Sequence, residues 1–417
     1  MGAAMTISDT DVRTSVKGLV VGMYVSRLDR PWLETTFPLQ GLKIGDQGEL
    51  LKLQRVCSYV YVDTARGPAP ELRYREYDPP AATNGAASEI VVLRKTEWTL
   101  QTGLAEELGA ATAAHDALKH SIEEVMIDLE AGRSLDLPKL KAGVDAMIES
   151  IVRNPSAFAW LKEIKRRDSY AYQHALGCAI WAASFGRHLG LDRSELQSLA
   201  LGGLLCDVGK TRLPEDLLLR RGPLSGDEAE LVHRHVQHSL DIVEQTAGLP
   251  PTIVEMVATH HERHDGSGYP WGLKGGAIPI FGRIMGLVDS YDAMTGIRPY
   301  ASSRSPHQAV TELYEHRGSL FQAELVEQFI QSCGIYPTGS LVELTTGQVG
   351  VVTEVHTLKR LRPKLMLLLG ADKTPLEQFL ELDMGEVERD AHGNLLAVKC
   401  GLAPGAYGID PAQLFLD

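Results

Sequence analysis

Apolar positions along the chain follow two patterns that change at recognisable points. Short β-branched and aromatic runs occupy 19–21, 23–25 and 59–63, broken by glycine and proline, and such runs predict strands. From about Glu97 to Val152 the apolar residues instead recur at helical spacing, and the same helical pattern continues from Ala157 to about Cys333. The clearest helical stripe consists of Leu118, Ile122, Val125, Met126 and Leu129.

Strand-like runs return after Gly334, at 340–344, 350–355 and 364–369, with turns between them. Pro79-Pro80 and the small residues at 81–88 predict a flexible linker. We therefore expect a multidomain, mainly α protein. Its predicted parts are a small β-rich N-terminal domain at 1–80, linker and helices at 81–140, a central all-α domain at 141–337, and a small all-β C-terminal segment at 338–417.

Composition narrows the class of protein. Hydrophobic residues make up 44% of the 417 residues, which is enough for a buried core. The net charge of −13 argues against binding of a nucleic-acid polymer, because an acidic surface repels phosphates. The five cysteines are scattered and odd in number, so a reducing cytoplasm fits better than a disulfide framework. We expect no signal peptide and no membrane span, since the chain has neither an apolar leader nor 18 uninterrupted apolar residues.

The histidines of the central region suggest a metal site. Imidazole and carboxylate ligands together suit iron, manganese or zinc. The side chains of adjacent His260 and His261 diverge by about 100° on a helix, which is natural for ligands of two nearby metals. Each residue alone also has an ordinary interpretation: a histidine can be a core or surface residue, and Asp207 can cap a helix. The candidate ligands are His174, Asp207, His235, His260, His261 and Asp289.

Several motifs follow one another in the order of a known family. Residues 206–210 (CDVGK) resemble the HD-x-GK element of the HD-domain phosphohydrolases, and 260–270 (HHERHDGSGYP) resemble the signature of the HD-GYP family. The resemblance covers about 165–335 and implies that the central all-α domain is of the HD type. Residues 22–63 resemble an uncharacterised domain that often precedes HD-GYP domains, and a sensory or docking role is the hypothesis for it.

The resemblance also implies an activity. HD-GYP proteins hydrolyse the second messenger cyclic di-GMP to pGpG or GMP in bacterial signalling, using two divalent metal ions, here expected to be iron or manganese. The resemblance implies that a hydroxide shared by the two ions would attack the phosphorus and that Asp207 would bridge the ions. By the same resemblance Asp207 and Lys210 are catalytic, and Lys210, Arg298 and Asp292 bind the substrate. The implied ligands are His174, Cys206, Asp207, His235, His260, His261 and Asp289.

The loop at Gly268, Tyr269 and Pro270 has two interpretations. It can simply form a tight turn beside the metals. The family resemblance also implies contact of this loop with diguanylate cyclase (GGDEF-type) domains, and an exposed Tyr269 would suit such an interface.

Position 206 departs from the family pattern, which has histidine where this chain has Cys206. A thiolate can bind iron or zinc, but it is softer and shorter than imidazole. A neutral buried thiol is the other interpretation, because free cysteine packs as a small hydrophobe. If Cys206 is no ligand, we expect one of the two metal ions to be lost or weakly held. The alternative function is then a degenerate domain that binds cyclic di-GMP, or docks on a cyclase, without turnover.

Overall fold

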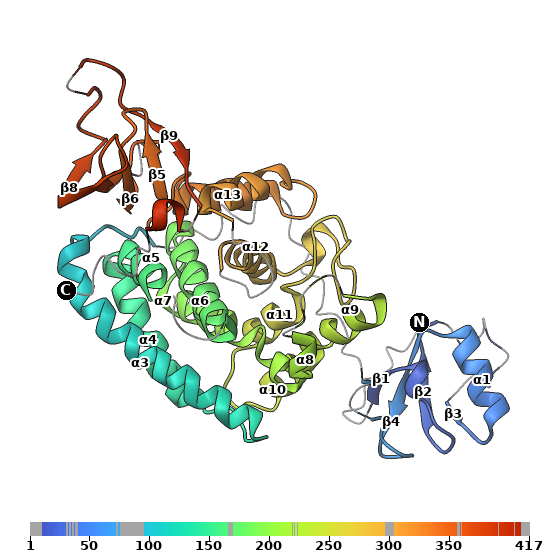
Figure 1. The fold of residues 1–417 in the computed structure, drawn as a ribbon. Helices are drawn as coiled ribbons and strands as arrows, with labels where there is room; N and C mark the ends of the chain where they lie inside the picture. Colours follow the sequence, from blue (N-terminus) through green and yellow to red (C-terminus); the bar gives the residue numbers. More distant parts are fainter. Residues whose placement is uncertain are drawn as a thin grey trace. The chain divides into compact units, whose positions relative to one another are not determined.

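The computed structural model describes residues 11–409 except 31, 33–34, 36, 38–40, 72–73, 76–95, 166–169, 219, 221, 223, 297–303, 357–358, 360, 391 and 404. The predicted linker at 79–88 lies outside the described residues. The chain divides into two compact units, 1–79 and 80–417 (Figure 1). The mainly α fold with small β-sheets near both ends of the chain confirms the predicted fold class.

The N-terminal unit is a four-stranded antiparallel sheet with one helix. The strands β1 (Asp11–Ser15), β2 (Tyr24–Leu28), β3 (Leu42–Lys43) and β4 (Tyr59–Asp63) have the order β1-β4-β2-β3, and α1 spans Gln47–Val56. The apolar side of α1 joins the core through Leu50 and Leu53. The sequence interpretation missed α1, a short helix of ten residues that lies between strands.

The expected strand at 19–21 is wrong. The backbone of Leu19 closes a short 3₁₀ turn, η1 (Val16–Gly18), and the side chains of Val20 and Val21 are 48% and 46% exposed. Gly22 then takes a left-handed φ of 99°, which turns the chain into β2.

A long helical region fills most of the second unit. The predicted stripe of α3 is confirmed at Leu118, Ile122, Val125 and Leu129, which are buried, and Met126 is half-buried. The helices are α3 (Leu104–Glu130), α4 (Leu137–Arg153), α5 (Pro155–Ile164), α6 (Tyr170–Leu189), α7 (Arg193–Leu205), η4 (Val208–Arg212), α8 (Glu215–Leu218), α9 (Gly226–His233), α10 (His235–Glu244), α11 (Pro251–Thr259), η5 (Gly275–Ala277), α12 (Ile280–Thr295), α13 (Pro306–Glu315) and α14 (Ala323–Cys333).

Helices α6, α7, α11 and α12 pack against one another in the middle of this region (Figure 1). The contact between α6 and α7 depends on Gly203. A Cβ atom at that position would lie 2.7 Å from the backbone nitrogen of Ala179 and 2.8 Å from the carbonyl carbon of Cys178. Glycine therefore allows the two backbones to approach, and this approach brings α6 next to the end of α7.

The C-terminal part is a five-stranded antiparallel sheet in the order β8-β7-β6-β5-β9. Trp160 of α5 packs on one face of this sheet, against Leu341 and Val351. The predicted strands correspond to β5 (Leu341–Leu344), β6 (Val349–Glu354) and β7 (Lys364–Leu369); the sequence pattern missed β8 (Pro375–Asp383) and β9 (Val398–Gly401). A short 3₁₀ turn, η6 (Ala406–Gly408), follows. None of the helices in the described part of the chain has both the length and the apolar character needed to cross a bilayer.

The close approach of α6 and α7 can be tested with Gly203→Ala. Its methyl group must displace backbone, so the free energy of unfolding should fall by about 1–3 kcal/mol in urea denaturation. Gly109→Ala is the matched control, because Gly109 is exposed within α3 and a Cβ there meets nothing within 4 Å. That variant should be neutral or slightly more stable. Equal effects of the two substitutions would contradict the packing argument.

Candidate metal centre

Asp207 lies where α7 ends and η4 begins. A capping box between Asp192 and Glu195 starts α7 and sets its register. At the other end, the hydroxyl of Ser239 in α10 accepts a hydrogen bond from the backbone N–H of Gly209 and donates one to the carbonyl of Cys206, both at 2.8 Å. A Cβ at Gly209 would lie only 2.1 Å from the carbonyl oxygen of His235. The glycine thus lets η4 pack on α10, and this contact brings Asp207 next to His235.

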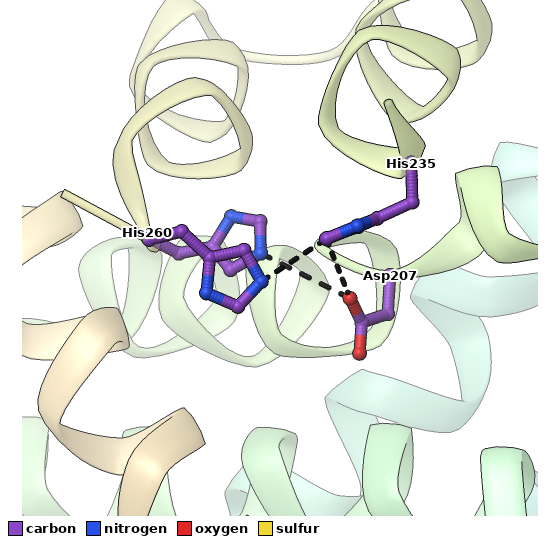
Figure 2. Close-up of side chains that lie close together, drawn as sticks. Asp207, His235 and His260 are labelled. Atoms are coloured by element: carbon purple, nitrogen blue, oxygen red, sulfur yellow. Dashed lines mark hydrogen bonds and ion pairs between the residues drawn. The ribbon is translucent and has the colours of Figure 1, made fainter. Parts of the chain in front are cut away.

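A first group of ligand atoms gathers around Asp207, and Figure 2 shows His235 and His260 pointing toward its carboxylate. His235 and His260 come from the start of α10 and the end of α11. Their Nδ1 atoms lie 2.7 and 2.8 Å from the carbonyl oxygens of Val232 and Val257, so each Nδ1–H donates there and each Nε2 faces the centre. The group consists of Asp207, His235, His260 and His261, whose ligand atoms lie within 4.8 Å of one another.

A second group lies between α6 and α12. His174 Nε2 is 3.0 Å from Asp289 Oδ1, and Cys178 Sγ is 3.9 Å from His174 Nε2. All three side chains are buried, and their ligand atoms also lie within 4.8 Å of one another. His174 Nδ1 points away from this group, 2.8 Å from Asp292 Oδ2.

The carboxylate of Asp207 faces both groups. Its Oδ1 lies 3.2 Å from His235 Nε2, and its Oδ2 lies 3.4 Å from His174 Nε2. Burial alone would raise the pKa of Asp207, but the charge of Lys210 and the two neighbouring histidines outweigh burial and hold that pKa well below its usual value. Asp207 is therefore ionised at neutral pH and presents one oxygen to each group.

The residues present fit divalent metal ions. His260 Nε2 and Asp207 Oδ1 are buried and have no hydrogen-bond partner among the described residues, although His235 Nε2 lies near the latter. Buried polar atoms left in this way are costly unless something binds them. Burial lowers the pKa of His260 to about 4 and the pKa of His261 well below its usual value. Both histidines are neutral at pH 7 and can offer lone pairs, as metal ligation requires.

The position of His261 fits only in part the expectation that adjacent His260 and His261 bind two different metals. It belongs to the same group as His260, and its Nε2 lies 3.0 Å from His235 Nε2. Its other nitrogen, Nδ1, is 3.8 Å from Asp289 Oδ2, so the ring also borders the second group.

Of the two cysteines near the centre, Cys178 belongs to a group of ligand atoms and Cys206 does not, among the described residues. Cys206 is buried beneath the end of α7 and, among the described residues, belongs to neither group of ligand atoms. Burial raises the pKa of its thiol well above the usual value. Cys178 was not among the predicted ligands. Its signal in the sequence is its position four residues after His174, which places both on one helix face.

The predicted substrate-binding residues occupy different positions. Lys210 is half-buried, and its Nζ donates to Asp207 Oδ2 at 2.5 Å. Asp292 is buried, with Oδ1 3.0 Å from Nζ of Lys162 and Oδ2 next to His174. Arg298 lies outside the described residues.

The loop at 268–270 covers part of the centre. The ring of Tyr269 stacks on His233, with 3.7 Å between ring centroids, and on His261, with 4.7 Å, so Tyr269 is less exposed than a free docking residue would be. Gly268 is half-buried and Pro270 is exposed. The sequence interpretation missed Glu262, whose carboxylate accepts hydrogen bonds from the backbone N–H groups of Trp271 and Leu273, both at 2.8 Å. Glu262 therefore ties the loop to the two histidines that precede it.

Known proteins resemble the chain over both units. Residues 157–325 match the HD domain family, and residues 12–140 match a domain of unknown function (DUF3391). A cyclic di-GMP phosphodiesterase of Pseudomonas aeruginosa is 30% identical over 377 residues, which is 89% of each chain. The cyclic di-GMP phosphodiesterase response regulator RpfG of Xanthomonas campestris is 34% identical over 38% of this chain and 44% of its own. A solved HDGYP protein of Bdellovibrio bacteriovorus, Bd1817, aligns with a TM-score of 0.46 and 16% identity, over 76% of this chain and 98% of that one.

Because Asp207 lies between the two groups of ligand atoms, its replacement should weaken metal binding. Asp207→Ala should lower the affinity for divalent metal by more than about 100-fold, because the first group loses its carboxylate and the second loses the carboxylate that faces His174. Metal content per chain after dialysis, measured by plasma mass spectrometry, reports this loss. Asp216→Ala, at an exposed carboxylate of the neighbouring α8, is the control and should retain metal. Full metal content in Asp207→Ala would show that the centre lies elsewhere.

Proposed function

The chain belongs to the HD-GYP family of HD-domain proteins, and from this premise we propose that it hydrolyses the phosphodiester bonds of cyclic di-GMP. The named activities of the relatives support the substrate, since they are cyclic di-GMP phosphodiesterases. The observation that carries the proposal is the position of Asp207 between two groups of ligand atoms.

This arrangement suits phosphodiester hydrolysis. Divalent ions, iron or manganese by family resemblance, would activate water and neutralise charge on the attacking and leaving oxygens. The residues to hold one ion are Asp207, His235, His260 and His261; those to hold the other are His174, Asp207 and Asp289.

The surrounding residues hold these ligands in their orientation. Asp292 accepts from Nδ1 of His174 and so directs Nε2 toward Asp207 and Asp289. Lys162 balances the buried charge of Asp292, at 3.0 Å. On this geometry Asp292 positions His174, and its direct contact with the substrate stays a prediction.

Lys210 is the cation best placed to meet the substrate. It lies beside Asp207 and is partly open to solvent. In the reaction, water oxygen bonds to phosphorus, the bond from phosphorus to the 3′ oxygen breaks, and that oxygen gains a proton. The product is linear pGpG, and a second hydrolysis gives GMP. The ammonium group of Lys210 would stabilise negative charge on the scissile phosphate or on the leaving oxygen.

A second candidate function is binding of cyclic di-GMP without turnover. The observation that favours it is the position of Cys206 outside both groups, which leaves the second group without the histidine that the family pattern places at 206.

Turnover assays distinguish the two functions. We expect protein purified without oxygen and loaded with Fe(II) or Mn(II) to convert cyclic di-GMP to pGpG or GMP, as measured by chromatography. 3′3′-Cyclic GMP-AMP serves as the comparison substrate. Tight binding of cyclic di-GMP with no product under either metal would reject hydrolysis and favour the binding module. Faster turnover of cyclic GMP-AMP would reject the assigned substrate.

Lys210 can be tested separately from metal binding. Lys210→Met should lower kcat by about 10²–10³-fold, because the methionine cannot stabilise charge on the phosphate. Metal content should stay unchanged. Lys141→Met, at an exposed lysine of α4, is the matched control and should keep the wild-type rate. A wild-type kcat in Lys210→Met would remove Lys210 from the reaction.

A further inference from the structure

We propose that Cys178 is a thiolate ligand of the second metal position and takes the place of the histidine absent at 206. This inference rests on the proposed metal-dependent function. It concerns a residue on α6, far in sequence from the HD-like element at 206–210.

The spacing of the donor atoms supports a shared ion. Zinc binds sulfur at about 2.3 Å and imidazole nitrogen at about 2.0–2.1 Å, so two such ligands in a tetrahedral site lie about 3.6 Å apart. Cys178 Sγ and His174 Nε2 are 3.9 Å apart. His174 Nε2 and Asp289 Oδ1 are 3.0 Å apart, which suits a nitrogen and an oxygen on one ion. The ligand atoms of Cys178, His174 and Asp289 all lie within 4.8 Å of one another.

Among the described residues, His174 is the hydrogen-bonding neighbour of the Cys178 sulfur. The side chain is 3% exposed. Among the described residues, the polar atoms within hydrogen-bonding range of Sγ are the two ring nitrogens of His174, and His174 Nδ1 already faces Asp292. Coordination would release the thiol proton to solvent and leave a thiolate beside the ion.

The backbone also fixes Cys178 in this place. The close contact of Gly203 with the carbonyl carbon of Cys178 seats this turn of α6 against α7, next to the segment that carries Asp207. Cys206 is also close enough to Cys178, Asp207 and Asp289 for their charges to affect its thiol, but among the described residues its sulfur is not one of the ligand atoms of either group.

A sulfur ligand changes which metal the second position prefers. Thiolate, imidazole and carboxylate together favour Fe(II), Zn(II) or Co(II) over Mn(II), because manganese prefers oxygen donors. The first group contains imidazole and carboxylate donors without sulfur. We therefore expect the two positions to differ in metal selectivity.

Cobalt reports the thiolate directly. The full chain is loaded anaerobically with Co(II), and cobalt per chain is measured together with the near-ultraviolet absorption that arises from thiolate-to-cobalt charge transfer. Wild type should bind two ions and show the band. Cys178→Ser should lose the band and one of the two ions, while Cys206→Ser, the matched control, should keep both. X-ray absorption of the zinc-loaded wild type should show a sulfur neighbour at about 2.3 Å, a measurement that needs no variant to fold.

The outcomes separate the two proposals. Bound cobalt without a thiolate band, or zinc without a sulfur neighbour, overturns the role of Cys178 and leaves the metal centre in place. A band that disappears in Cys206→Ser and persists in Cys178→Ser assigns the sulfur to Cys206 and also overturns the inference. A wild-type chain that binds no divalent metal overturns the metal centre and the proposed function together.

Discussion

The close packing of three carboxylates, two of them buried and one partly buried, is the constraint that organises the centre. Asp207, Asp289 and Asp292 all lie within or beside the α6–α12 contact. Removing an ion from water costs several kcal/mol unless opposite charge or hydrogen bonds compensate. His174 contacts all three carboxylates, Lys162 pairs with Asp292, and Lys210 pairs with Asp207. Divalent ions would supply the remaining positive charge between the two groups of ligand atoms.

Helix ends bring these groups together. Asp207 follows the last turn of α7, His235 is the first residue of α10, and His260 and His261 follow α11. His174 and Asp289 instead project from within α6 and α12. Close backbone contacts at Gly203 and Gly209 allow this convergence, so the site depends on helix packing as much as on the ligands themselves.

The sequence predicted the family, and most of the residues that the structure brings together in the two groups, because both depend on residue types in a fixed order. The mainly α class with small β parts followed from apolar periodicity and is confirmed. The sequence missed Cys178 because a cysteine on an apolar helix looks like a packing residue until α12 is placed beside it. Glu262 was missed because its partners are backbone N–H groups of a loop, and no pattern of side chains in the sequence reveals the path of that loop. Helix α1 was missed because its ten residues lie between strand-like runs, and the whole segment was therefore interpreted as β.

We propose above all that two metal positions share Asp207. Crystals of the iron-loaded protein, with diffraction data collected above and below the iron absorption edge, test it most directly. We expect two anomalous peaks on opposite sides of the Asp207 carboxylate, one next to His235, His260 and His261 and the other next to His174 and Asp289. A single peak that does not contact Asp207, or no peak in this region, would contradict it.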